Sequence, residues 1–304
     1  MSNVLIEVLN RTPVEDQRVE LVERKGLGHP DSICDAIVEE VSVALCREYL
    51  AGAGRVLHHN VDKGLLVAGR TEPCVGGGRV VEPMRFVLGD RATAEYRGRH
   101  FDVAGIAESA TRQWIRHNLP HVDPDRHWRF QSELKEGSPE LTDLFERETI
   151  GANDTSAAVG YAPLSETERL VLSAEHFLNS AEFKRRYPEA GEDVKVMGFR
   201  RDRELHLTVA IAFVDRYVSD AASYFARKEE MRLALERYLA QQQKTLDCIS
   251  VSVWLANPAM SGRPTLTPFA TPIAITSGTS RPAWVPPLDD VNTTWLGDTP
   301  SASH

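Results

Sequence analysis

Residues 23–32 read Glu-Arg-Lys-Gly-Leu-Gly-His-Pro-Asp-Ser, and this stretch stands directly before a segment with helical periodicity. Pro30 has a φ angle suited to the first turn of a helix and no N–H group to satisfy, so we expect a helix to begin there. Apolar side chains then recur at helical spacing, at Ile33, Ile37, Val38, Val41 and Leu45. The stretch therefore predicts a loop that leads into a buried amphipathic helix.

The same loop has the composition of an anion-binding site. The N-terminus of a helix carries partial positive charge and free N–H groups. Gly26 and Gly28 allow the backbone to approach a ligand closely, and Lys25 adds positive charge beside them. These features indicate a phosphate-binding loop. An ordinary capped helix after a tight turn is the alternative, and the stretch alone favours neither.

His29 and Asp31 add chemistry that a plain anion site lacks. Imidazole titrates near neutral pH, and a carboxylate oxygen is a hard ligand for a divalent cation. A nucleotide that binds together with magnesium would use both groups. His29 and Asp31 are therefore candidate site residues.

Composition limits the class of protein. With 304 residues, 42% of them hydrophobic and 26% charged, the chain can form a substantial core and more than one structural unit. A formal net charge of -9 argues against general nucleic-acid or membrane-surface binding, because those partners require a basic face. The four cysteines have no C-x-x-C spacing, and the chain shows neither a secretory signal nor a membrane-spanning run. We therefore expect a cytoplasmic protein.

Strand and helix patterns alternate along the chain. A capping-box pattern at Ser165 to Glu168 predicts a helix that ends at Leu178. Further helices are predicted within 93–118 and over about 218–243, and strands over 55–69, 84–88, 194–197 and 205–214. Helix, two strands and helix thus recur, which predicts an α+β fold built from repeated units.

We expect three segments. Residues 1–150 would hold the first two α+β units with the phosphate loop, residues 151–247 another α+β unit, and residues 248–304 a poorly matched tail. Prolines interrupt every potential element of that tail, since proline lacks the N–H donor and restricts the residue before it. Residues 254–304 are therefore predicted to be mostly irregular, with one strand over 251–255.

Polar residues in two predicted strands are further candidates. Asn60 and Asp62 share one strand face, although Asp62 beside Lys63 is equally typical of a solvated ion pair. Asp193 and Lys195 share a face in the same way, with valines between and after them to pack inward. An exposed strand face is the equally weighted alternative for this second pair.

Asn153 and Asp154 lie in a loop of small residues. An aspartate without a nearby lysine or arginine is a candidate to bind an ammonium group. These residue types also favour an Asx-turn, and the loop alone slightly favours that alternative.

Taken together, five ordered motifs resemble the archaeal-type S-adenosylmethionine synthetase (methionine adenosyltransferase) family. The motifs are residues 23–32, 58–63, 76–83, 152–165 and 191–198, and the resemblance covers about residues 3–247. It implies similar α+β domains around a pseudo-threefold axis and a homodimer with active sites between subunits. It also implies Mg²⁺ and K⁺ as activators.

The resemblance further implies a reaction between ATP and L-methionine. The methionine sulfur attacks C5′ of ATP, the triphosphate leaves, and the triphosphate is hydrolysed to pyrophosphate and phosphate. By motif position, the catalytic residues would be His29, which stabilises charge at the ribose O5′, and Lys195, which contacts the polyphosphate.

The resemblance assigns roles to the other candidates as well. They would complete the site as follows: Lys25, Gly28 and Asp193 at ATP and its phosphates, Asp31 at magnesium, Asp154 with Asn153 at methionine, and Asn60 with Asp62 at a less definite position in the site.

The chain departs from the family pattern after residue 247. The family continues with a Gly-rich segment that carries a further magnesium carboxylate and arginines, whereas this chain has only Gly278-Thr279-Ser280 followed by Arg281. Loss of such charges lowers the rate, so we expect impaired activity and infer a truncated or frame-altered tail. The alternatives are an inactive nucleotide-binding homologue that pairs with a full-length synthetase as a regulatory or structural subunit, and a stand-alone tripolyphosphatase.

Overall fold

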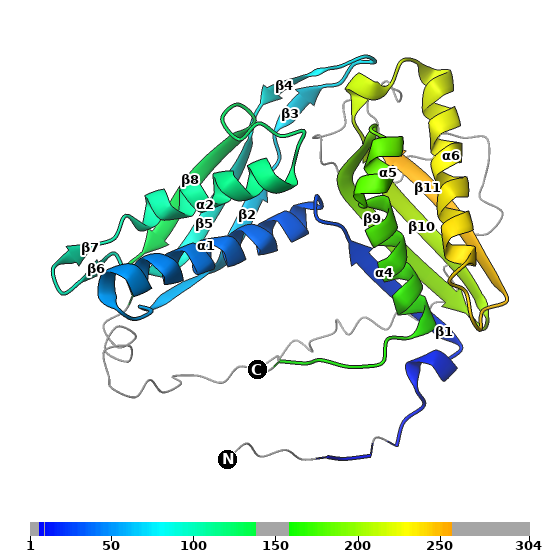
Figure 1. The fold of residues 1–304 in the computed structure, drawn as a ribbon, viewed down its shortest axis with the longest axis horizontal. Helices are drawn as coiled ribbons and strands as arrows, with labels where there is room; N and C mark the ends of the chain where they lie inside the picture. The colour runs from blue at the N-terminus through cyan, green and yellow to red at the C-terminus, as the bar shows by residue number, and fades with distance from the viewer. Residues whose placement is uncertain (1–5, 9, 138–157, 257–304) are drawn as a thin grey trace, which may run out of the picture. The chain divides into compact units, whose positions relative to one another are not determined.

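The computed structural model describes residues 6–8, 10–137 and 158–256, with side chains to residue 253 (Figure 1). A short 3₁₀ turn, η1 (Val14–Asp16), precedes strand β1 (Val19–Lys25). After β1 the chain forms two α+β units of the same plan. None of the described helices is long and apolar enough to cross a lipid bilayer.

The first unit has the order α1-β2-β5-α2-β8. Its sheet has the strand order β2-β5-β8, with β2 antiparallel to β5 and β5 parallel to β8. Two small hairpins, β3 with β4 and β6 with β7, project from it. The bounds are α1 (Pro30–Ala53), β2 (His59–Val67), β3 (Arg70–Glu72), β4 (Arg79–Glu82), β5 (Met84–Ala92), β6 (Glu95–Tyr96), β7 (Arg99–His100), α2 (Val103–Asn118) and β8 (Trp128–Lys135).

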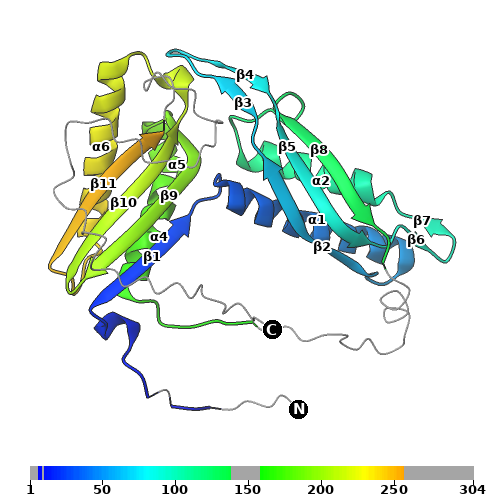
Figure 2. The same ribbon diagram turned by 180° about the vertical axis from the view of Figure 1, so that it is seen from behind.

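The second unit repeats this plan as α4-β9-β10-α6-β11. Strand β9 is antiparallel to β10, and β10 is parallel to β11. In addition, β1 pairs antiparallel with β9, which gives the four-stranded order β1-β9-β10-β11 (Figure 2). The bounds are α4 (Glu166–Leu178), α5 (Ala181–Arg186), β9 (Ala190–Arg201), β10 (Glu204–Phe213), η2 (Asp215–Tyr217), α6 (Ala221–Ala240) and β11 (Cys248–Ala256).

The repeated plan has a physical reason. Two parallel neighbouring strands need a long crossover, and helices α2 and α6 supply it between β5 and β8 and between β10 and β11. Each unit buries its own apolar core, around Ile37, Phe86 and Trp128 in the first and around Leu170 and Leu207 in the second. The predicted α+β fold with repeated units is confirmed.

The start of α4 is fixed as its sequence predicts. The Ser165 hydroxyl accepts a hydrogen bond from the Glu168 N–H at 3.0 Å, and the Glu168 carboxylate accepts one from the Ser165 N–H at 2.7 Å. The Ser165 hydroxyl also donates to Glu20 on β1 at 2.6 Å, and Glu20 forms a buried ion pair with Arg200 at 3.1 Å. The cap of α4 therefore also anchors β1.

Two element boundaries differ from the prediction. Helix α2 begins at Val103 rather than near residue 93, because residues 95–100 form a hairpin whose turn has Arg97 and Gly98 at positive φ. The strand predicted over 251–255 is confirmed, but β11 runs from Cys248 to Ala256, so residues 254–256 are not irregular. Proline-free sequence to Asn257 allows this length.

The four-stranded sheet draws on all three predicted segments. Strand β1 belongs to the segment 1–150, β9 and β10 to the segment 151–247, and β11 to the segment 248–304. The division of the chain into those segments remains a prediction, and residues 257–304 lie outside the described part.

Candidate functional site

The loop 26–29 joins the end of β1 to the start of α1. The Gly26 N–H donates to the Val194 carbonyl at 2.7 Å and the Gly28 N–H to the Glu192 carbonyl at 3.1 Å, so the loop continues the β1–β9 ladder. A Cβ on Gly28 would lie 2.4 Å from the carbonyl carbon of Glu192. Only glycine fits there, because the loop backbone packs directly on β9.

His29 is the N-cap of α1. Its Nδ1 accepts the Asp31 N–H at 3.2 Å, so in the neutral ring the proton is on Nε2. The residue is 4% exposed, and Nε2 is buried without a hydrogen-bond partner among the described residues. Burial lowers the pKa of His29; Asp31 opposes this effect, and Lys25 and Lys195 add to it. The site thus contains a neutral imidazole with an unused N–H donor.

Asp31 lies in the first turn of α1 and is exposed. Its carboxylate contacts the Lys25 ammonium at 2.5 Å. This hydrogen bond lowers the pKa of Asp31 and raises that of Lys25. Both groups are therefore charged at neutral pH, and each is within reach of solvent.

Lys25 and Lys195 are direct partners in the antiparallel register of β1 and β9. Like charges in that position repel each other. Glu23, two residues before Lys25 and on the same face, lies between them, 2.7 Å from the Lys195 Nζ and 3.8 Å from the Lys25 Nζ. Glu23 thus neutralises Lys195, Asp31 neutralises Lys25, and an anion could bind the two ammonium groups by displacing these carboxylates.

The sequence motifs assign no role to Glu23. The signal was its spacing of two from Lys25, which places both on one face if the strand continues to residue 25. The sequence predicts residues 23–25 as part of the loop, where strand alternation does not apply. The structure extends β1 through Lys25.

Asp193 and Lys195 share one face of β9, as the sequence predicts, while Val194 and Val196 are fully buried in the core. Asp193 is nevertheless only 6% exposed. Burial raises the pKa of Asp193 to about 7, against the opposing effect of Lys195. The carboxyl is therefore near its titration point at neutral pH.

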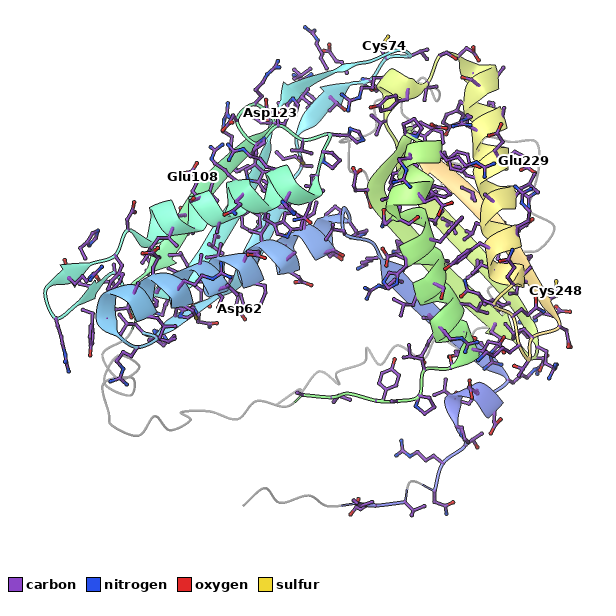
Figure 3. All side chains as sticks on the ribbon, in the orientation of Figure 1. Asp62, Cys74, Glu108, Asp123, Glu229 and Cys248 are labelled. Carbon is purple, nitrogen blue, oxygen red and sulfur yellow. The ribbon has the colours of Figure 1, made fainter. Side chains whose placement is uncertain are left out.

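Asn60 and Asp62 lie elsewhere, on β2, where both are exposed on either side of buried Val61 (Figure 3 labels Asp62). Asn60 donates to Asp90 at 3.0 Å, and Asp62 contacts Lys63 at 2.7 Å. Among the described interactions, none joins this pair to the loop 26–29. Asn153 and Asp154 lie outside the described residues.

The Gly-rich motif at 76–78 is bound to η2. The Asp215 carboxylate accepts the N–H groups of Cys74 at 3.2 Å and Gly78 at 2.9 Å. Gly76 and Gly77 have positive φ angles, which glycine adopts without strain. In the described structure this motif therefore has a conformational role.

The described residues contain no group of three or more His, Cys, Asp or Glu side chains that could hold a metal ion. Magnesium commonly binds through one or two carboxylates together with phosphate oxygens and water. Asp31, exposed beside two ammonium groups, fits a magnesium ion that arrives with a polyphosphate. We assign no described residue to K⁺.

Known proteins resemble this chain over most of its length. A family model for S-adenosylmethionine synthetase (AdoMet synthetase) matches residues 2–265. S-adenosylmethionine synthase of Methanothermobacter thermautotrophicus is 47% identical over 234 residues, 76% of this chain and 58% of that protein. That of Pyrococcus furiosus is 47% identical over 238 residues, 77% of this chain and 59% of that protein.

The matched region is shorter than these relatives. The probable S-adenosylmethionine synthase of Aquifex aeolicus, 44% identical over 241 residues, is covered to 60%. The chain thus spans 58 to 60% of the length of these relatives. A solved structure of an unusual S-adenosylmethionine synthetase from Campylobacter jejuni matches with 14% identity and a TM-score of 0.43, over 77% of this chain and 58% of that chain.

Proposed function

The chain belongs to the S-adenosylmethionine synthetase family, and from this premise we propose that it functions in the synthesis of S-adenosylmethionine from ATP and L-methionine. Because the chain spans 58% of the length of a curated relative, the whole reaction is a proposal for this protein. The alternative is a homologue that binds nucleotide without turnover and acts as a subunit of a complete synthetase.

One observation carries the proposal. The His29 Nε2–H is buried without an acceptor, at a helix N-terminus and close enough to Lys25 and Lys195 for both to lower its pKa. An unpaired buried donor is costly, and a substrate oxygen would satisfy it. The geometry suits an anion with an oxygen facing His29 and further charge facing the two ammonium groups.

These groups match the charge that the reaction develops. A bond forms between the methionine sulfur and C5′, the C5′–O5′ bond breaks, and its electron pair leaves on O5′ of the triphosphate. A donated hydrogen bond from His29 to O5′ and the ammonium groups of Lys25 and Lys195 would stabilise that charge more in the transition state than in the ground state. Water then hydrolyses the triphosphate to pyrophosphate and phosphate.

Asp31 would hold Mg²⁺, which supplies charge neutralisation at the polyphosphate when bound. In that role the Asp31 carboxylate would no longer contact the Lys25 ammonium, which lies 2.5 Å away in this structure. Lys25 is then free to contact phosphate. K⁺ is a second proposed activator.

The methionine end of the site is proposed on motif position. Asp154, with Asn153, would bind the methionine ammonium group. Asn60 and Asp62 belong to the proposed site on the same ground, while their described contacts are with Asp90 and Lys63.

We also propose that two copies pair through the face of the four-stranded sheet that turns away from its helices. On this face Val19 and Leu21 of β1 are 45% and 64% exposed, and Met197 and Phe199 of β9 are half-buried. The face continues directly to Lys25 and Lys195. A homodimer, or a pair with a full-length homologue, would cover the apolar part and enclose the charged part.

The test is incubation of the purified chain with ATP, L-methionine, Mg²⁺ and K⁺, with direct measurement of S-adenosylmethionine and of the phosphate products. Formation of both in a His29-dependent way is the expected result. If ATP binds but no S-adenosylmethionine forms at high protein concentration, the non-catalytic alternative replaces this function. Product that appears only after a full-length homologue is added would support the subunit alternative in its paired form.

A further inference from the structure

The Asp193 carboxyl is buried at the edge of the proposed phosphate site. The hydrogen bonds from Gly26 to Val194 and from Gly28 to Glu192 continue the antiparallel ladder beyond Lys25. The loop backbone is therefore hydrogen-bonded to the residues on either side of Asp193, which is itself 6% exposed.

No described residue forms an ion pair or hydrogen bond with the Asp193 side chain. Lys195, two residues along the same face, is the cation that acts on it, but its Nζ contacts Glu23 at 2.7 Å. An ionised carboxylate at Asp193, which is 6% exposed, would therefore have no counter-ion of its own among the described residues, which is unfavourable.

An ionised Asp193 would also work against the proposed ligand. A polyphosphate held by Lys25 and Lys195 carries several negative charges, and a second buried anion on the same face would repel them. A protonated carboxyl removes this repulsion and offers an O–H donor. Anion sites gain specificity from such donors.

We propose that Asp193 is held as the neutral carboxylic acid and donates its O–H to an oxygen of the polyphosphate bound at Lys25 and Lys195. This inference rests on the proposed function, because it takes the ligand of that site to be the polyphosphate of ATP. It gives Asp193 the role of a hydrogen-bond donor rather than that of an acceptor or a metal ligand.

The binding of polyphosphate must then depend on pH. Burial sets the pKa of Asp193 at about 7 in the ligand-free protein, and a bound anion raises it further. Affinity therefore falls as the pH rises above about 7, by up to about tenfold per unit until Asp193 ionises in the complex as well.

Other titratable or charged groups lie on the elements packed around Asp193. Their ionisation and that of the ligand contribute to any measured pH profile, so the profile needs a reference protein. They are Glu23 and Lys25 of β1, His29 of the loop, Asp31 of α1, Glu175 of α4, Lys184 of α5, and Glu192 and Lys195 of β9.

The experiment is a calorimetric titration of the full chain with inorganic tripolyphosphate and Mg²⁺ between about pH 6 and pH 9. Asp193→Asn is the matched variant, because its amide keeps a donor and cannot ionise. We expect wild type and Asp193→Asn to bind alike at the acidic end, and wild type to bind at least about tenfold more weakly than Asp193→Asn at the alkaline end. The ratio of the two affinities cancels contributions from the ligand.

Two further measurements keep the result decisive. Asp193→Ala, which has no donor, should bind about tenfold more weakly than Asp193→Asn at every pH. The infrared difference spectrum between wild type and Asp193→Asn at the acidic end should show the C=O band of a protonated carboxyl. Circular dichroism of each variant checks that it is folded.

The outcomes separate this inference from the function on which it rests. A wild-type to Asp193→Asn ratio that is constant with pH, or the absence of the infrared band, overturns the neutral-acid proposal while the phosphate site stands. A failure of every protein to bind tripolyphosphate at any pH overturns the proposed phosphate site itself.

Discussion

Strands β2 and β9 occupy equivalent places in the two α+β units, yet they differ in what lies beside them. Each follows the first helix of its unit and pairs antiparallel with the next strand. Strand β9 has β1 along its other edge, whereas β2 is an edge strand of its described sheet. The two strands also carry similar polar residues, Asp62 and Lys63 on β2 and Asp193 and Lys195 on β9.

The difference decides how each lysine is used. Lys63 is neutralised within its own sheet, by Asp62 at 2.7 Å and Asp90 at 3.7 Å. Lys195 faces a second lysine, Lys25, supplied by β1, with Glu23 between them. Strand β2, which has no further strand on this edge of its described sheet, therefore carries a solvated ion pair. Strand β9, which pairs with β1 and the loop 26–29, carries a candidate anion site instead.

The largest expected effect is at His29, which lies in the loop beside Lys25 and Lys195 and has no counterpart beside Lys63 among the described residues. His29→Ala should lower S-adenosylmethionine formation by about a thousandfold or more, because it removes a donor aimed at developing charge. His59 of β2 is the control, since its ring nitrogens already contact the Leu57 carbonyl at 3.0 Å and the Ser42 hydroxyl at 2.9 Å. His59→Gln should change the rate by less than about tenfold. Equal losses at both histidines in steady-state assays would contradict the comparison.

The next effect distinguishes Lys195 on β9 from Lys63 on β2. Lys195→Met should weaken tripolyphosphate binding by about ten- to a hundredfold, because one of two ammonium groups on the ligand is lost. Lys63→Met should change it by less than about twofold, since its partners are on β2 and β5. Calorimetric titration of both variants gives the two numbers. A larger loss for Lys63→Met would place the site on β2 instead.

The close packing of the loop predicts a stability effect. Gly28→Ala should lower the free energy of unfolding by about 1–3 kcal/mol, because its Cβ would overlap the backbone of Glu192. Gly160→Ala is the matched control, since no atom lies within 4 Å of a Cβ at that position. Urea unfolding measures both. If the two substitutions cost the same, the loop does not pack on β9 as described.

The smallest effect is a pH dependence of stability. An ordinary aspartate ionises near pH 4 in the unfolded chain, whereas Asp193 in the folded chain ionises near pH 7. Between these values the folded chain binds more protons, so its stability falls as the pH rises. Asp193→Asn removes this loss and should be about 1–2 kcal/mol more stable relative to wild type at pH 8 than at pH 6. Asp62→Asn, at an exposed position, should show no such gain in stability. Denaturant unfolding of both variants at the two pH values measures it. If Asp193→Asn also showed no gain, the account would be refuted.

Local patterns in the sequence predict much of this structure. The helix that begins at Pro30, the capping box at Ser165 and the alternation of Val194 and Val196 against Lys195 each depend on neighbours within a few residues. Helical and strand periodicities report such features directly. They also placed His29 and Asp31 at a helix N-terminus.

The features that make the candidate site depend on distant residues. The pairing of β1 with β9 places Lys25 opposite Lys195, which lies 170 positions later in the chain. No local pattern encodes this contact. Asp193 is also buried although it shares the face of Lys195, and the loop 26–29 that is hydrogen-bonded to its neighbours Glu192 and Val194 lies far earlier in the chain.

A crystal structure of the full chain with tripolyphosphate and Mg²⁺ tests the central claim most directly. We predict phosphate oxygens within about 2.7–3.2 Å of the His29 Nε2 and of the Lys25 and Lys195 ammonium groups, with Glu23 displaced from Lys195. Tripolyphosphate bound beside Lys63 on β2, with the His29 Nε2 still unpaired, would contradict the claim.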